Sequence, residues 1–267
     1  MKHRGQVQAI QRFEKAFGTG VLVLDQLPKW VKVGIGNKLV KPKICIISAV
    51  CPDYEIANGK FTYRNMGDGL PHTAARHLEF IKQTLPILAS AGITFEYHMT
   101  LADTEFDLPM IVKHLAGGNP QLFQEKCQKS CEKLMDYAKE SDAPLVSCER
   151  FTSVFPDWFE QYHKSLQILA DNPISQGSVS SEAWSRVPLY RAMAGREITI
   201  DYSREMVVRQ RAQYMAWGEC ATRRFGDSLI MINHLTPNLE FINHPAMRRD
   251  RPRIPIIKLP ISTMPAS

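Results

Sequence analysis

Short apolar runs alternate with amphipathic segments along most of the chain. Residues 43–50 form a β-branched apolar run that breaks at Cys51-Pro52-Asp53, as a buried strand does when it ends in a loop. Over 71–91 apolar residues recur every three or four positions and Gly92 follows, which predicts a helix. Residues 93–99 alternate in the manner of a second strand. This order predicts a crossover between two parallel strands, because such connections are right-handed and favour parallel pairing.

The rest of the chain continues the alternation of helices and strands. Further helices are predicted over 120–141, 155–170 and 203–225, further strands over 143–148, 228–234 and 253–259, and a loop over 171–178. In the last helix Ser203 is the expected N-cap and Gly226 the stop. The expected fold class is therefore α/β: a Rossmann-like open, mostly parallel sheet with helices on both faces. We expect it to be one domain over 43–267, preceded by a basic segment over 1–42.

Composition and charge narrow the class of protein. The 267 residues are 44% hydrophobic and 22% charged, which is typical of a globular chain. The apolar runs have the length of strands, and the first residues lack the pattern of a secretory signal, so we expect a cytoplasmic protein without a membrane partner and with reduced cysteines. Residues 1–43 hold nine lysines and arginines against two acidic residues, and 245–267 hold five against one. Such ends either attract phosphate-rich partners such as RNA or are solvated tails.

Polar residues directly after the apolar runs are the first candidates for chemistry, because ligands of open parallel sheets bind beyond the carboxyl ends of the strands. Ser48 and Cys51 are the candidate nucleophiles, since a hydroxyl or thiol at a strand end is held rigidly. The alternatives are a small residue that closes a strand and a buried thiol beside a turn proline. His234 could act as a base, bind a phosphate, or cap a strand.

A second group of residues could bind a substrate. Candidates at the strand ends are Asp53, Tyr54, Asp103, Glu105, Asn233 and Asn238. For Asp103 and Glu105 the capping of the next helix is the favoured alternative. On the long helix Tyr214 and Trp217 share a face, which core packing explains, whereas Glu219 could hold a substrate ammonium group.

We expect neither a metal nor a cofactor. Cys127 and Cys131 lie one helical turn apart, but no second Cys/His pair follows at the spacing of a zinc site. Gly67 and Gly69 precede a helix and lack both a Walker lysine and the full dinucleotide fingerprint.

The segment Ile46-Ile47-Ser48-Ala49 resembles the one that carries the nucleophilic serine of tRNA-dependent cyclodipeptide synthases, whose core is similar to class I aminoacyl-tRNA synthetases. The later order of elements is also similar, including a strand that ends in His234-Leu-Thr-Pro. The resemblance implies an aminoacyltransferase with Ser48 as nucleophile and aminoacyl-tRNA as partner. It also implies that Tyr214 and Glu219 grip the amine, although they are five residues apart here and one helical turn apart in the family. Basic residues of the long helix would then contact tRNA phosphates: Arg209, Arg211, Arg223 and Arg224.

A second resemblance covers 51–108 and is to isocyanide synthases, which use a free aromatic amino acid. It includes a Gly-Asp-Gly loop, a helix with Ala-Ala-Arg-His-Leu and a strand that leads to Ala-Asp-Thr-Glu-Phe-Asp-Leu. The lysine and serine typical of that family's first loop are absent. A third hypothesis is a non-catalytic RNA- or nucleotide-binding protein whose basic ends supply the affinity.

Overall fold

The computed structural model describes residues 43–50, 53–57, 60–64, 74–75, 77–79, 81–82, 94–103, 109–171, 173–226, 229–233, 239–248, 254 and 256–258. The predicted basic segment 1–42 lies outside these residues. Within them, no helix is both long enough and apolar enough to cross a membrane.

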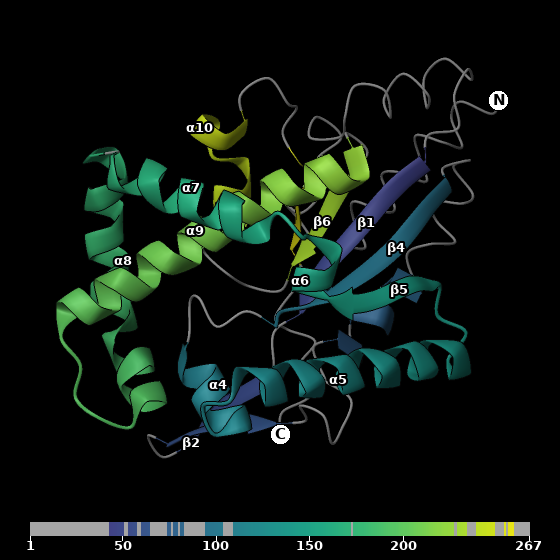
Figure 1. Cartoon of the computed structure of the whole chain (residues 1–267), viewed down its shortest axis with the longest axis horizontal. Coiled ribbons are helices and arrows are strands. Elements are labelled where there is room, and N and C mark those ends of the chain that lie inside the picture. The colour runs from purple at the N-terminus through teal and green to yellow at the C-terminus, as the bar shows by residue number, and fades with distance from the viewer. Residues whose placement is uncertain are drawn as a thin grey trace.

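Within the part of the chain that the structure describes, five parallel strands form the main sheet (Figure 1). They are β1 Lys43–Val50, β4 Thr94–Leu101, β5 Leu145–Arg150, β6 Leu229–Asn233 and β7 Ile256–Lys258, in the spatial order β5-β4-β1-β6-β7. Counted along the chain within this sheet, the order is 3-2-1-4-5, which is that of the Rossmann fold. The expected α/β class is thus confirmed, and β7 lies at one edge of the sheet. β4 and β5 lie on one side of β1, and β6 and β7 lie on the other, so the strand order reverses between β1 and β6. Open α/β sheets bind their ligands at such a reversal.

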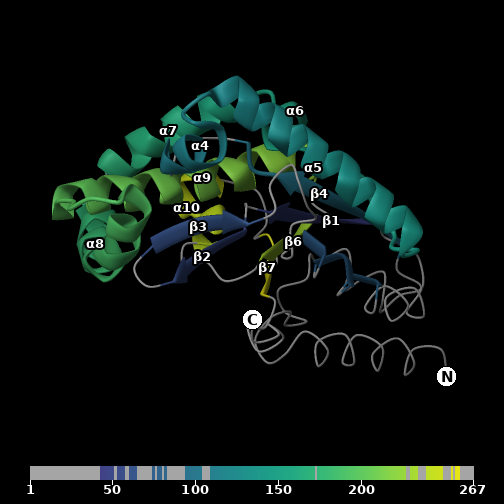
Figure 2. The same ribbon diagram turned by 90° about the horizontal axis from the view of Figure 1, so that it is seen from below.

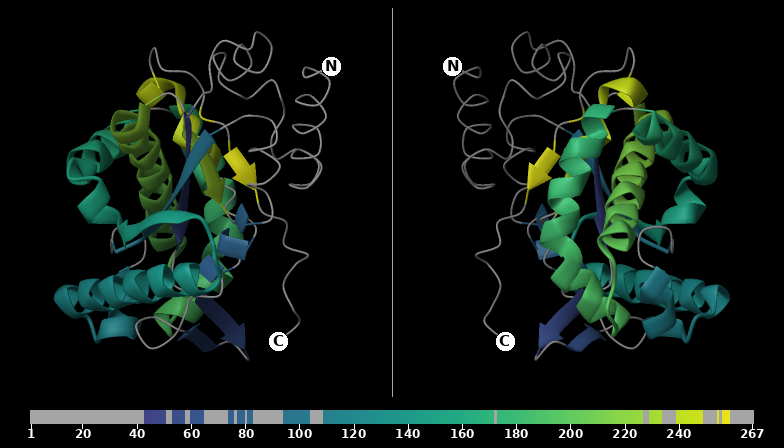
Figure 3. Two further views of the ribbon diagram at one scale, coloured as in Figure 1. Left: turned by 90° about the vertical axis from the view of Figure 1, so that its right-hand side faces the viewer. Right: turned by 90° about the vertical axis from the view of Figure 1, so that its left-hand side faces the viewer.

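Helices pack on both faces of this sheet. The helices with described bounds are α4 Pro109–Ala116, α5 Pro120–Glu140, α6 Phe151–Val154, α7 Trp158–Ala170, α8 Pro173–Ala194, α9 Ile200–Phe225, the 3₁₀ helix η3 Leu239–Asn243 and α10 Pro245–Arg248, of which α8 packs on α9 and not on the sheet. In Figure 3, α9 runs alongside the strands and α5 crosses beneath them. α5 begins where the Asn119 side chain accepts hydrogen bonds from two backbone amides of the first turn, at 3.0 and 3.2 Å.

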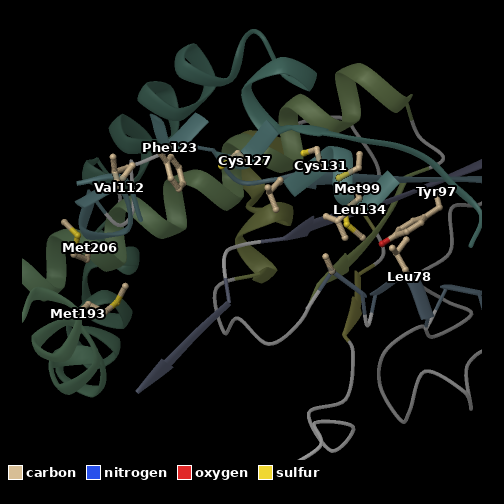
Figure 4. Packing of buried hydrophobic residues seen from close by; sticks show 14 of the residues in the cluster. Leu78, Tyr97, Met99, Val112, Phe123, Cys127, Cys131, Leu134, Met193 and Met206 are labelled. Carbon is tan, nitrogen blue, oxygen red and sulfur yellow. The ribbon is translucent and has the colours of Figure 1, made fainter. Parts of the chain in front are cut away.

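Two hydrophobic clusters divide the core between the two faces. In the first cluster, Tyr97 and Met99 of β4 pack with residues of α5 such as Cys127 and Cys131 (Figure 4). In the second, Ile47 of β1 packs with α7, α9 and η3. Among the described residues, β4 and β5 supply buried side chains to the first cluster and β1 supplies them to the second.

The structure corrects two local expectations and contains a hairpin that the sequence pattern did not predict. Asp53–Ala57 and Lys60–Arg64 form an antiparallel hairpin, β2–β3, whose second strand contacts α4 and α8 (Figure 2). The loop predicted over 171–178 is wrong, because α8 begins at Pro173, where proline lacks only an N–H that has no partner in the helix anyway. The predicted Ser203 cap is also wrong.

α9 begins earlier than the sequence pattern indicated. Thr199 is its N-cap, and the Thr199 side chain accepts a hydrogen bond from the Tyr202 amide at 3.1 Å. Ser203 lies one turn further on and donates to the carbonyl of Ala183 in α8 at 2.7 Å. Both residue types can cap a helix, so only the packing of α8 decides which one does.

Candidate functional site

Ser48 lies at the centre of the sheet near the carboxyl end of β1. It pairs with Met99 of β4 on one side and with Ile232 of β6 on the other, so it is placed where the strand order reverses. Its side chain is fully buried. The Tyr97 hydroxyl donates a hydrogen bond to Ser48 Oγ at 2.8 Å, and Thr100 Oγ1 donates to the Ser48 carbonyl at 3.2 Å. The strand, its neighbour and two hydroxyls therefore hold this serine in one orientation.

Tyr97 is the partner that the sequence did not reveal. Burial raises the pKa of its phenol well above the usual value, and the hydrogen bond to Ser48 opposes that shift only in part. The phenol therefore stays protonated and acts as a donor. Because Ser48 Oγ accepts this bond, the serine keeps its own proton for a different acceptor. The alternation of side chains along β4 indicated that Tyr97 faces one side of the sheet. Its partner Ser48 could not be found in this way, because that contact depends on the register of β4 against β1.

A second polar cluster lies on the other face of the same two strands. The ligand atoms of Cys45, Glu96 and His98 lie within 4.8 Å of one another. His98 Nδ1 lies 2.9 Å from the Ser147 hydroxyl, its Nε2 lies 3.7 Å from Glu96, and its ring stacks at a tilt on Phe225 at 5.1 Å. Burial lowers the pKa of His98 below its ordinary value, and the nearby Glu96 carboxylate offsets this in part. Sequence analysis did not single out any of the three.

Tyr214 and Glu219 do not join Ser48 in the described structure. Tyr214 packs against the second cluster, with its ring centroid 6.2 Å from that of Trp217, whereas Ser48 faces Tyr97 in the first. Glu219 accepts a hydrogen bond from Arg223 at 3.2 Å. Five residues of helix turn the two side chains about 140° apart, so they cannot clasp one group as a pair one turn apart would.

Asp103 has a structural role, although not at the helix that its favoured alternative named. Its carboxylate accepts hydrogen bonds from the Thr152 amide at 3.0 Å and the Thr152 hydroxyl at 2.6 Å, and it lies 3.7 Å from Arg150. It therefore caps α6, which follows β5, and not the helix that follows its own strand. The carboxylate is fully buried, with its oxygens engaged by these groups.

The other predicted residues are placed as follows. Asp53 and Tyr54 lie in β2, and Asn233 is the last residue of β6. Four lie outside the described residues: Cys51, Glu105, His234 and Asn238.

The four arginines of α9 have different surroundings. The Arg211 side chain is only 5% exposed; it lies 2.8 Å from Glu182 of α8, and its guanidinium stacks 4.6 Å from the Phe241 ring centroid. Arg209 is partly exposed and pairs with Glu205 one turn away. Arg223 and Arg224 are exposed at the end of the helix, Arg223 paired with Asp157 and Arg224 over the Phe225 ring.

No protein-family model matches the sequence, and no curated protein matches it. Solved structures do match. A cyclodipeptide synthase from Bacillus thermoamylovorans is 12% identical, covers 83% of this chain and 89% of its own, and has a TM-score of 0.47. One from Staphylococcus haemolyticus is 10% identical, with 80% and 89% covered and a TM-score of 0.46. One from Streptomyces noursei is 10% identical, with 82% and 95% covered and a TM-score of 0.43.

The fold resembles that of cyclodipeptide synthases. This confirms the resemblance expected from the sequence, across most of the chain and as a likeness of fold. At such low identity a shared fold does not carry a shared reaction, because folds host many activities. The chemistry must be argued from the residues of this chain.

Proposed function

We propose that the protein is an aminoacyltransferase that receives the aminoacyl group of an aminoacyl-tRNA on Ser48 and passes it to the amine of a second amino acid. The observation that supports this most is the Ser48–Tyr97 pair. A serine hydroxyl stands at the reversal point of a Rossmann-order sheet, held by a phenol that stays protonated.

The proposed reaction has two transfers. Ser48 Oγ attacks the ester carbonyl, its bond to carbon forms as the bond to the ribose oxygen breaks, and the serine proton passes to that leaving oxygen. The acceptor amine then attacks the seryl ester, an amide bond forms, and the amine's proton returns to Ser48 Oγ. Tyr97 keeps donating to Oγ and so fixes its direction.

Burial of Ser48 suits this reaction. An aminoacyl ester hydrolyses when water reaches it, and a site that excludes water leaves the amine as the acceptor. The Ser48 side chain has no exposed surface and lies beside Tyr97 and Met99 of the first cluster. The acyl group must therefore be admitted next to Oγ, with bulk water kept away.

Contacts to tRNA phosphates are proposed for the exposed arginines of α9 and for the basic ends of the chain. Arg209, Arg223 and Arg224 have guanidinium groups at or near the surface. Arg211 has no part in this proposal because its guanidinium is buried against Glu182. Binding of this kind weakens steeply as salt rises, since each phosphate contact releases counterions.

The test is intact-mass spectrometry of the protein after incubation with a pool of aminoacyl-tRNAs and an acid quench. We expect a mass increase of one aminoacyl residue on the wild type and on Cys51→Ala, and none on Ser48→Ala. Tyr97→Phe keeps the ring but not the hydroxyl, so it should form the same adduct more slowly. Circular dichroism checks that each variant is folded.

Two results would contradict the proposal. The same adduct on a folded Ser48→Ala protein would exclude Ser48 as the nucleophile. A wild-type protein that yields neither adduct nor amide product from any aminoacyl-tRNA, but converts a free amino acid, would favour the isocyanide-synthase hypothesis.

A further inference from the structure

We propose that Cys45, Glu96 and His98 form a binding site for a zinc-type divalent metal ion on the face of the sheet opposite Ser48. The three side chains come from the adjacent parallel strands β1 and β4. Cys45 is the register partner of Glu96, and His98 is two residues further along β4, so all three point to one face. The proposal does not depend on the aminoacyltransferase function.

The distances suit a tetrahedral ion. Bonds of about 2.0–2.3 Å to zinc hold its ligand atoms roughly 3.3–3.7 Å apart. Glu96 and His98 Nε2 are already 3.7 Å apart, and all three ligand atoms lie within 4.8 Å of one another. Side-chain rotations that bring the ligand atoms about 1 Å closer together would therefore complete the arrangement.

The surroundings of His98 also match a metal ligand. A metal-binding histidine usually directs its second ring nitrogen to a supporting group, which fixes the ring. Here Nδ1 lies 2.9 Å from Ser147 Oγ on β5, and this leaves Nε2 for the cluster. Nε2 is buried and has no hydrogen-bond partner among the residues that the structure describes. A metal would supply that partner.

The donor set selects the type of ion. One thiol, one imidazole and one carboxylate suit zinc and related transition metals, whereas calcium and magnesium prefer oxygen alone. Three protein ligands leave a fourth position for water. The Glu96 side chain is 34% exposed and provides the contact with solvent, whereas Cys45 is nearly buried. A bound ion would tie β1 to β4 and stabilise the sheet.

The first test measures zinc binding by full-length, tag-free protein after removal of metal with a chelator. We expect one zinc per chain in competition with a chromophoric chelator. Glu96→Gln and His98→Gln should bind far more weakly, and Ser147→Ala about tenfold more weakly because His98 loses its support. His163→Gln removes an exposed histidine of α7 and is the matched control, with binding unchanged.

The second test uses cobalt as a spectroscopic probe. Cobalt should give a thiolate charge-transfer absorption with the wild type and with His163→Gln, and Cys45→Ser should abolish it. Glu96→Gln is nearly isosteric at a partly exposed position, so it should fold even if Cys45→Ser does not. The proposal is overturned if the wild type binds no zinc, or if zinc binding is equal in the wild type, Glu96→Gln and His98→Gln.

Discussion

Arg211→Met tests whether this arginine holds the helices together or binds RNA. Arg211 Nη2 and Nε donate to the same oxygen of Glu182, at 2.8 and 3.3 Å, and join α9 to α8. The guanidinium also lies over the Phe241 ring of η3. Methionine keeps the aliphatic stem and removes the charge. We expect a large loss of stability, because three helices meet at this one side chain.

The magnitude follows from the contacts. A charge-assisted hydrogen bond is worth about 1.5–3 kcal/mol, and a cation–π contact away from water about 1–2 kcal/mol. Removing one partner of a buried ion pair costs roughly 3–5 kcal/mol when the other charge is left unpaired. Glu182 keeps Arg186 at 2.8 Å, so the cost should fall at the lower end, about 3 kcal/mol.

Equilibrium unfolding in urea measures this loss, with Arg209→Met as the control. Arg209 lies two residues earlier on the same helix and forms a half-exposed pair with Glu205, so its loss should cost less than about 1 kcal/mol. Equal costs for the two variants would refute the structural role of Arg211. A gel-shift assay with tRNA supplies the second readout. Folded Arg211→Met should bind tRNA as the wild type does. Weaker binding by the folded variant would indicate that Arg211 contacts RNA after all.

Two further predictions concern the segment between β6 and β7. Asn243→Ala removes two buried hydrogen bonds to the backbone of Ile254, at 2.8 and 2.7 Å, and should lower the free energy of unfolding in urea by about 2–4 kcal/mol; a loss below about 1 kcal/mol would contradict it. His244 Nδ1 accepts from the Ala246 amide at 3.3 Å, and burial lowers the pKa of His244, so the unfolded chain takes up a proton at higher pH than the folded one. The melting temperature of the wild type should therefore fall as the pH drops below about 6.5. The same drop in pH should lower the melting temperature of His244→Asn by less, because asparagine does not titrate there and can still cap α10.

The local pattern of side chains was enough to place most elements. β1, β4, α5 and the parallel order followed from runs of apolar residues, because a strand or an amphipathic helix is defined by periodicity within a few residues. The β2–β3 hairpin and α8 were missed. α8 contains Gly177 and Pro188, which weigh against a helix in an isolated segment, and packing against α9 and α7 outweighs that preference.

The sequence by itself also determined that Ser48 lies near the carboxyl end of a buried strand, since that depends only on the run in which it lies. Only the tertiary structure decided its partner. Tyr97 is 49 residues away and reaches Ser48 through the register of β1 against β4. The same register places Cys45 beside Glu96 on the opposite face. A shift of one residue would exchange the two faces, and no local pattern contains that information because register is set by the packing of whole strands.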